Sequence, residues 1–201
     1  MAAAWRKAFD GAPGVVVVEG DILDGPCDAL LSPANSFGFM DGGIDLAYRR
    51  YFGSDIQARV QAKIRSEFHG ELPVGQAMVV PTGHETVPYL VAAPTMRIPD
   101  KIGDTVNVYL AFRAALLAVV SHNKGSTASI KTMRTPALGR ALERCLWLGR
   151  RIKCMQLTFP FLRILSGSRI QPLSFYITRT SDQRDGRVAR QCRPGKKCVP
   201  R

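Results

Sequence analysis

Two polar side chains near the start of the chain follow directly on predicted strands. Asp21 comes after a short β-branched run, and Asn35 comes after the next apolar run. A carboxylate at Asp21 can accept hydrogen bonds from an exocyclic amine such as adenine presents, and the backbone N–H of Ile22 can serve a ring nitrogen. The amide of Asn35 can both donate to and accept from a ribose hydroxyl.

A glycine pair stands further along the same stretch. Gly42 and Gly43 come directly before a predicted helix that opens at Ile44. Glycine lets backbone N–H groups approach a phosphate closely, and a helix N-terminus adds a favourable partial positive charge. The pair therefore indicates a place for phosphate groups.

Taken singly, each of these signals has a simpler explanation. A Gly-Asp pair after a strand is most often a turn, and a Gly-Gly pair before a helix is most often a sharp bend. Asn35, which follows Pro33 and Ala34, can cap or turn the chain. Only the order and spacing of the whole set favour a ligand site.

Alternating strand and helix patterns predict a layered α/β sheet that holds these loops. Short apolar or β-branched runs predict strands at residues 15–19, 28–32, 75–80, 89–93 and 130–133. Open sheets of this kind bind ligands at the carboxyl ends of their strands, which is where the polar loops would lie.

Helical spacing of apolar residues predicts three helices between these strands. The first opens at Ile44 and ends at Gly53, the second is capped by Asp55, and a long third helix is capped by Asp104. The third helix is expected to turn these residues inward: Val106, Tyr109, Leu110, Leu117 and Val120.

The residues resemble a known family, the macro domains. The motifs that carry the resemblance are Val18-Glu19-Gly20-Asp21-Ile22, Cys27 to Asn35, Gly42-Gly43-Ile44-Asp45, Gly75-Gln76-Ala77, Ala93-Pro94-Thr95-Met96 and Thr135-Pro136-Ala137-Leu138-Gly139. The resemblance covers residues 15–139 and implies a three-layer α/β/α fold with a mixed sheet. The stretch from Ser36 to Gly43 is similar to a bacterial or phage-type variant, in which Asp41 stands where the commoner loop carries a glycine.

The resemblance implies ADP-ribose or a related ADP-ribosyl metabolite as the ligand, and some family members hydrolyse ADP-ribosyl esters or O-acetyl-ADP-ribose. The ligand-binding residues that it implies are Asp21 and Ile22 for adenine, Asn35 for the distal ribose, Gly42, Gly43 and Ile44 for the pyrophosphate, and Leu138 with Gly139 at the end of the last strand. The implied candidate catalytic residues are Asn35 and Asp45. Reader and hydrolase both stay open.

Asp45 and two phenylalanines of the ligand loop, of which Phe37 is a candidate ligand-binding residue, have alternative explanations of equal weight. Asp45 matches an aspartate that hydrolytic members use to position or activate water, but a carboxylate in a first helical turn is also favoured by the macrodipole. Phe37 and Phe39 flank Gly38 in the ligand loop. They can stack on a base or ribose, or they can bury the loop against the core.

The net charge of +12 is unevenly distributed. Residues 1–138 contain 13 Lys and Arg against 13 Asp and Glu, whereas residues 139–201 contain 15 against 3 and therefore hold the whole excess. Cysteine follows the same division: Cys27 lies in the first part, and Cys145, Cys154, Cys192 and Cys198 lie in the second. One chain thus carries two compositions.

The resemblance ends where the composition changes. A macro domain continues with a second Gly/Ser-rich phosphate loop and a final helix, whereas this chain continues with Arg140-Ala141-Leu142-Glu143. We therefore divide the chain into a macro domain at residues 1–139, which lacks that loop and helix, and a divergent, basic, partly disordered tail at residues 140–201. Loss of half of the phosphate cradle predicts weakened or absent ADP-ribose binding.

Three explanations of the tail stay open: a shifted reading frame, a genuine basic extension, or an unfamiliar final helix. The basic residues also favour an alternative function, in which a degenerate, non-catalytic macro scaffold binds nucleic acid by neutralising phosphates. No recognition motif accompanies those residues, and this alternative is therefore the weaker one.

Other features bound the remaining possibilities. The cysteine spacings of the tail match no common zinc pattern, and we predict neither a metal nor a cofactor. No apolar run reaches the length of a membrane span, and no secretory signal is recognisable, so we expect a cytoplasmic protein without a membrane partner. The oligomeric state and the physiological substrate stay open.

The reading-frame hypothesis predicts a specific feature of the coding DNA. A one-base change near codon 139 should restore a Gly-rich loop followed by a helix, because an out-of-frame translation of GC-rich DNA yields runs rich in Arg, Cys, Ser and Pro. Sequencing the gene across this junction is the measurement. If neither alternative frame encodes such a loop, the hypothesis is wrong.

Overall fold

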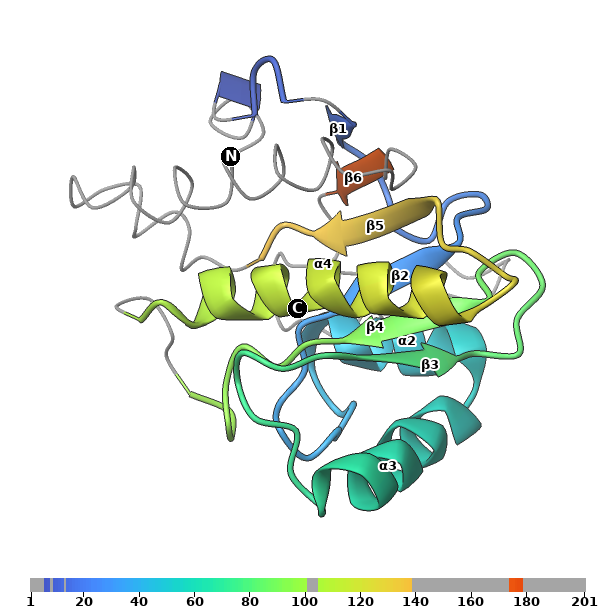
Figure 1. Cartoon of the computed structure of the whole chain (residues 1–201), viewed down its shortest axis with the longest axis vertical. Coiled ribbons are helices and arrows are strands. Elements are labelled where there is room, and N and C mark those ends of the chain that lie inside the picture. Colours follow the sequence, from blue (N-terminus) through green and yellow to red (C-terminus); the bar gives the residue numbers. More distant parts are fainter. Residues whose placement is uncertain (1–5, 8, 13, 101–104, 139–173, 179–201) are drawn as a thin grey trace, which may run out of the picture.

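In the computed structural model of the chain, residues 6–7, 9–12, 14–100, 105–138 and 174–178 are described. They form a six-stranded sheet with helices on both faces (Figure 1). The strands are β1 (Val15–Val17), β2 (Ala29–Ser32), β3 (Met78–Pro81), β4 (Tyr89–Ala92), β5 (Thr132–Pro136) and β6 (Ser174–Thr178), and the helices are α2 (Gly43–Phe52), α3 (Asp55–Phe68) and α4 (Asn107–Gly125).

The sheet is mixed, with the strand order β1-β6-β5-β2-β4-β3. Neighbouring strands from β1 to β4 in that order pair in parallel, whereas β3 pairs antiparallel to β4 at one edge. The predicted mixed α/β sheet with helices is therefore confirmed.

Alternating residues of the central strands supply the two hydrophobic cores. In β2, Leu31 packs with α4 on one face, and Leu30 packs with α2 and α3 on the other. Successive strand residues point to opposite faces, so a run buried on both sides reads as continuously apolar. Figure 1 shows α4 on one side of the sheet and α2 with α3 on the other.

The predicted strands and helices agree with the structure except at several boundaries. Helix α2 ends before Gly53, as predicted, but α3 begins at Asp55 itself, after Ser54, without a side-chain cap. Helix α4 begins at Asn107, and the predicted cap Asp104 lies outside the described residues. The hydroxyl of Thr105 accepts a hydrogen bond from the Asn107 N–H, which explains a later helix start.

The inward face of α4 was predicted wrongly in part. Val106 is 58% exposed and Leu117 is 37% exposed, whereas Ala111 and Ala115 are almost fully buried against the sheet. Small side chains on the sheet side let the helix lie close to the strands. Phe112, Leu116 and Val119 complete the buried face, and the predicted Val120 is also buried, so the prediction failed only at Val106 and Leu117 among the residues that are clearly exposed.

Strand β6 was not predicted from the sequence. It pairs in parallel with β5, from Thr132 opposite Ser174 to Pro136 opposite Thr178, and also with β1. Its central residues Phe175, Tyr176 and Ile177 are aromatic or β-branched and thus typical of a strand. The domain boundary at residue 139 stays a prediction, and β6 is the segment beyond it that the structure describes.

The parallel pairing places four loops at one edge of the sheet. The chain leaves β1, β2, β4 and β5 at the same edge because the carboxyl ends of parallel strands point in one direction. A bridge between Asn35 and Met96 shows that the loops after β2 and β4 lie side by side.

Among the described helices, none has the length and apolar character to cross a membrane.

Candidate functional site

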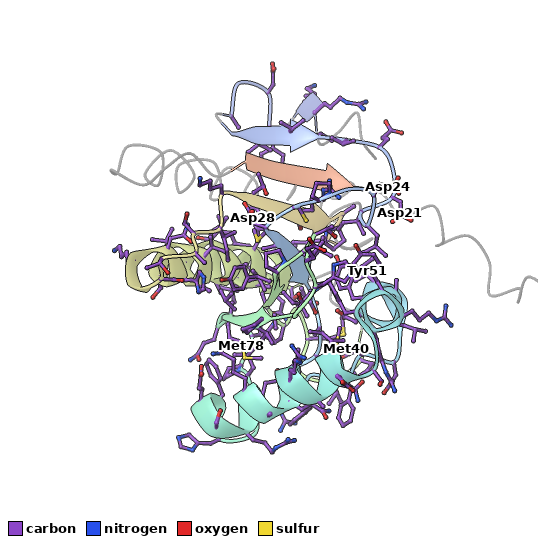
Figure 2. All side chains as sticks on the ribbon, turned by 90° about the vertical axis from the view of Figure 1, so that its right-hand side faces the viewer. Asp21, Asp24, Asp28, Met40, Tyr51 and Met78 are labelled. Carbon is purple, nitrogen blue, oxygen red and sulfur yellow. The ribbon has the colours of Figure 1, made fainter. Side chains whose placement is uncertain are left out.

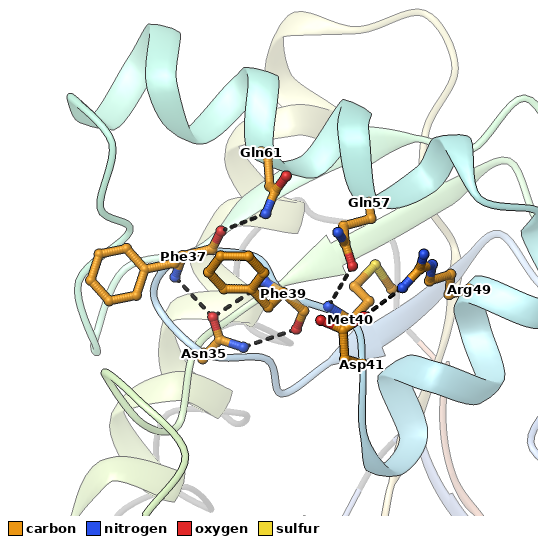
Figure 3. Close-up of polar contacts among 8 residues, drawn as sticks. All are labelled: Asn35, Phe37, Phe39, Met40, Asp41, Arg49, Gln57 and Gln61. Carbon is orange, nitrogen blue, oxygen red and sulfur yellow. Dashed lines mark hydrogen bonds and ion pairs between the residues drawn. The ribbon is translucent and has the colours of Figure 1, made fainter.

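The side chain of Asn35 holds the loop after β2 in shape (Figure 3). Its Nδ2 donates to the carbonyl of Phe39 at 2.9 Å, and its Oδ1 accepts from the N–H groups of Phe37 at 3.0 Å and Phe39 at 3.3 Å. An amide has two N–H donors and two acceptor lone pairs. After these bonds, Asn35 retains one N–H that can be donated to a ligand.

Side chains of helix α3 support this loop (Figure 3). Gln57 accepts a hydrogen bond from the Met40 N–H at 2.9 Å, and Gln61 donates to the Phe37 carbonyl at 3.4 Å. Gly38 lies so close to α3 that a Cβ there would be 2.8 Å from Val60. Its φ of +70° also favours glycine. The loop is therefore ordered before any ligand binds.

The glycine pair lies in open space at the start of α2. Gly42 and Gly43 are exposed, and a Cβ built on either would meet no atom within 4 Å. Gly43 has a φ of +56°, in the left-handed region, and the first helical turn follows it. The N–H groups of a first turn have no partner within their helix and attract anions. This geometry can accept phosphate oxygens.

An ion pair lies beside the glycine pair. Asp41 and Arg49, one on the loop and one on α2, approach within 2.5 Å, as Figure 3 shows. Both side chains are partly exposed, so the pair contributes little to stability, on the order of 0–1 kcal/mol. The pair mainly affects the local charge, because Arg49 neutralises the Asp41 carboxylate next to the glycine pair, where anions are favoured.

Asp45 lies in the first turn of α2, but its side chain points inward. It is 8% exposed and accepts a hydrogen bond from the hydroxyl of Ser32, at the end of β2, at 2.5 Å. Burial raises the pKa of Asp45 to about 6, and the hydrogen bond from Ser32 opposes part of that shift. The carboxyl therefore titrates close to neutral pH, as a general base requires.

The loop after β1 carries the predicted adenine contacts. Asp21 is exposed, its Oδ1 accepts from the Leu23 N–H at 3.0 Å, and its carbonyl accepts from the Asp24 N–H at 3.3 Å. The side chain of Ile22 is fully buried in the core that α2 and α3 cover. Figure 2 shows Asp21 and Asp24 close together at the periphery of the molecule. Asp21 thus both shapes a turn and remains accessible.

The structure gives Phe37 a partner that the sequence did not predict. The guanidinium of Arg97, from the segment after β4, lies 5.2 Å from the centre of the Phe37 ring. Glu71 accepts two hydrogen bonds from the same guanidinium, at 2.8 and 3.0 Å. Cation–π contacts of this geometry are favourable. Phe37 is thus held at the loop by a cation, while Phe39 is 53% exposed.

The last predicted segment is described only in part. Leu138 is 5% exposed and belongs to the core under α4, so its side chain is not available to a ligand. Gly139 and the four cysteines of the tail lie outside the described residues. Within the described ranges, no three His, Cys, Asp or Glu side chains are grouped to hold a metal ion.

Comparison with known proteins matches most of the described chain to one family. A family model described as "Macro domain" matches residues 31–147, which is more than half of the chain. An uncharacterized protein of Aquifex aeolicus is 32% identical over 102 residues, covering 51% of this chain and 58% of that protein. A "Macro domain-containing protein in non 5'region" of Streptomyces griseus is 38% identical over 72 residues, or 36% and 41% of the two chains. An uncharacterized protein of Aeropyrum pernix is 31% identical over 125 residues, and the chain spans about three fifths of the length of this protein and of the Aquifex aeolicus protein.

Solved structures share the fold at low sequence identity. A macrodomain of Oceanobacillus iheyensis with ADP gives a TM-score of 0.63 at 17% identity, covering 84% of both chains. A Trypanosoma brucei macrodomain in complex with ADP-ribose gives 0.60 at 13% identity, covering 82% of this chain and 63% of the other. The macrodomain of Mycobacterium tuberculosis DarG gives 0.56 at 18% identity, covering 82% and 96%.

The raised pKa of Asp45 predicts a pH-dependent effect of Asp45→Asn on stability. The folded-state pKa lies above the unfolded value, so the contribution of Asp45 is most favourable below pH 4 and is lost as the pH rises through about 6. We compare the free energy of unfolding of Asp45→Asn with that of the wild type at each pH. The difference should favour the variant more at pH 8 than at pH 4, by up to about 3 kcal/mol.

Urea unfolding of both proteins at several pH values measures this difference. Asp55→Asn is the matched control, because Asp55 also lies in a first helical turn but is exposed. An equal effect of Asp45→Asn at pH 4 and pH 8 would contradict the buried, ionising carboxyl.

Proposed function

The chain belongs to the macro domain family, and on this premise we propose that the loops at the carboxyl edge of its sheet bind ADP-ribose or a related ADP-ribosyl metabolite. The observation that carries the proposal is the ordered loop from Asn35 to Gly43, which ends in two open glycines at the start of α2. Two solved structures of the same fold, the macrodomains of Oceanobacillus iheyensis and Trypanosoma brucei, contain ADP and ADP-ribose respectively.

Each part of the ligand has a suitable partner in this proposal. Asp21 accepts from the adenine amine, and the N–H of Ile22 serves the ring. The remaining N–H of Asn35 is donated to a hydroxyl of the distal ribose. The pyrophosphate lies over Gly42 and Gly43, where the N–H groups of the first turn and the positive end of α2 favour anions. Gly42, Gly43 and Ile44 therefore contribute backbone groups rather than side chains.

The proposal includes a weakened affinity. In a macro domain, a second loop after the strand that corresponds to β5 wraps the phosphates, and here the chain departs from that pattern after Gly139. One set of backbone donors is thereby lost. We expect a dissociation constant weaker than micromolar, with the adenine and the distal ribose still contacted.

We further propose that bound ADP-ribosyl esters are hydrolysed with Asp45 as general base. The carboxylate takes a proton from a water molecule as the water oxygen attacks the ester carbonyl. The bond between the carbonyl carbon and the ribose oxygen then breaks, and the ribose oxygen receives the proton from Asp45 to become a hydroxyl. Ser32 fixes one oxygen of Asp45 by its hydrogen bond at 2.5 Å. The same burial that raises the pKa of Asp45 makes it a stronger base than an exposed carboxylate.

The binding proposal predicts that Asp21→Ala and Asn35→Ala each weaken ADP-ribose binding about tenfold or more, because each removes hydrogen bonds to the ligand. Calorimetric titration at high ligand concentration measures the change. Asp24→Ala is the matched control, since Asp24 is exposed on the same loop as Asp21 (Figure 2). Equal affinities in all four proteins would contradict the assignment, and a micromolar or tighter constant would contradict the weakened cradle.

The hydrolysis proposal predicts that Asp45→Ala lowers turnover of O-acetyl-ADP-ribose by about 100-fold or more while binding persists. The wild-type rate should rise as the pH increases through about 6, because only the ionised carboxyl accepts a proton. Acetate release as a function of pH is the measurement, and Asp55→Ala serves as the control. A protein that binds ADP-ribose but releases no acetate at any pH is a reader, and the general-base role is then wrong.

A further inference from the structure

Arg134 places a charged side chain on the face of the sheet that α2 and α3 cover, beside apolar core residues. It lies on β5 opposite Leu30 of β2, and it is half-buried. Its neighbour Met133 packs into the core under α4, so Arg134 points to the opposite face, where Leu30 and Ile22 also lie. A cation in such a place needs several hydrogen-bond acceptors.

Those acceptors are the backbone carbonyls of a single loop. Nη1 of Arg134 donates to the carbonyls of Ile22 at 3.2 Å and Gly25 at 3.0 Å, and also to that of Asp24. Nη2 donates to the carbonyl of Pro26 at 3.2 Å. The loop after β1 is therefore folded around the guanidinium, and its carbonyl dipoles point toward the positive charge.

Asp21 organises the same loop from the other side. It accepts the N–H of Leu23 on its carboxylate and the N–H of Asp24 on its carbonyl. Carbonyl groups of the loop thus face Arg134, while two of its N–H groups face Asp21. The shape of the loop, and with it the direction of the Asp21 carboxylate and the Ile22 N–H, depends on both residues.

We propose that Arg134 is the positioning residue for the adenine end of the ligand site. It contacts no atom of the ligand in this assignment, and it acts through the loop that carries Asp21 and Ile22. Lysine cannot replace it fully, because an ammonium group lacks the planar fork of five N–H donors that reaches several carbonyls at once. The inference rests on the proposed binding of ADP-ribose, since it assigns a role within that site.

The test compares two nucleotides that differ only at the base. ADP-ribose carries the exocyclic amine, and inosine diphosphate ribose carries a carbonyl oxygen in its place, so the ratio of their dissociation constants reports the contact with Asp21. We expect the wild type to bind ADP-ribose about tenfold more tightly than inosine diphosphate ribose. Arg134→Met should lose most of this preference, while its dissociation constant for the inosine compound changes little. Arg134→Lys should recover only part of it.

Arg59→Met is the matched control. Arg59 also donates to loop carbonyls, those of Pro81 and Thr82 at 3.5 and 3.0 Å, but at the turn between β3 and β4. It should retain the preference for ADP-ribose. If Arg134→Met and Arg59→Met weaken the binding of both nucleotides equally, Arg134 has only a structural role and the proposal is overturned.

A second measurement follows the loop without a ligand. Amide hydrogen exchange of Leu23 and Asp24 should accelerate in Arg134→Met and stay unchanged in Arg59→Met, because their N–H groups depend on the shape that Arg134 maintains. Unchanged exchange in Arg134→Met would overturn the proposal. A wild type that binds neither nucleotide would contradict the proposed function itself, whereas a wild type that discriminates normally beside an unaffected Arg134→Met would contradict the role of Arg134 alone.

Discussion

Parallel pairing of β2 with β4 on one side and with β5 on the other is the constraint on which the site depends. It brings the chain out of each strand at one edge of the sheet, so residues far apart in the sequence lie in neighbouring loops. The bridge from Asn35 to Met96 and the contact of Phe37 with Arg97 are direct consequences. Loops that are held in this way need little further ordering to receive a ligand, which lowers the entropic cost of binding.

Three carboxylates lie in a region proposed to bind an anionic ligand, and the fold treats each of them differently. Asp41 is neutralised by Arg49. Asp45 is buried, with its carboxylate turned inward to the Ser32 hydroxyl. Asp21 lies on a separate loop, assigned to the uncharged base. Repulsion between protein and pyrophosphate is thereby limited without removing a carboxylate that the proposed chemistry uses.

The sequence predicted those parts of the fold that local chemistry determines. A run of valines ending at Gly20, and Gly53 after a helical pattern, were sufficient to locate β1 and the end of α2. The buried face of α4 was only partly predictable, because Ala111 and Ala115 share it with Leu116 and Val119, whereas Leu117 is turned outward. Strand β6 was missed because its flanks are basic and polar, although Phe175, Tyr176 and Ile177 carry a strand pattern.

The candidate site shows the same limit. The polar loop residues could be identified from their order along the chain, but their internal bonds could not. That Asn35 uses most of its hydrogen-bonding capacity within its own loop follows from the loop conformation alone. The roles of Arg97 and Arg134 depend on contacts between distant segments, and a single arginine on a strand or loop carries no signal of such contacts.

The position of β6 has a consequence for the order in which the molecule assembles. Among the described strands, β1 pairs with β6 alone. β6 lies between β1 and β5 although both of these strands precede it in the chain. Strand β1 therefore cannot form this pairing until β6, which comes far later in the chain, is available. Closing so long a loop makes this pairing slow compared with the local contacts of β3 with β4. The loop that carries Asp21 joins β1 to β2, so its β1 end depends on this late pairing, whereas the rest of the loop is held by Arg134 of β5.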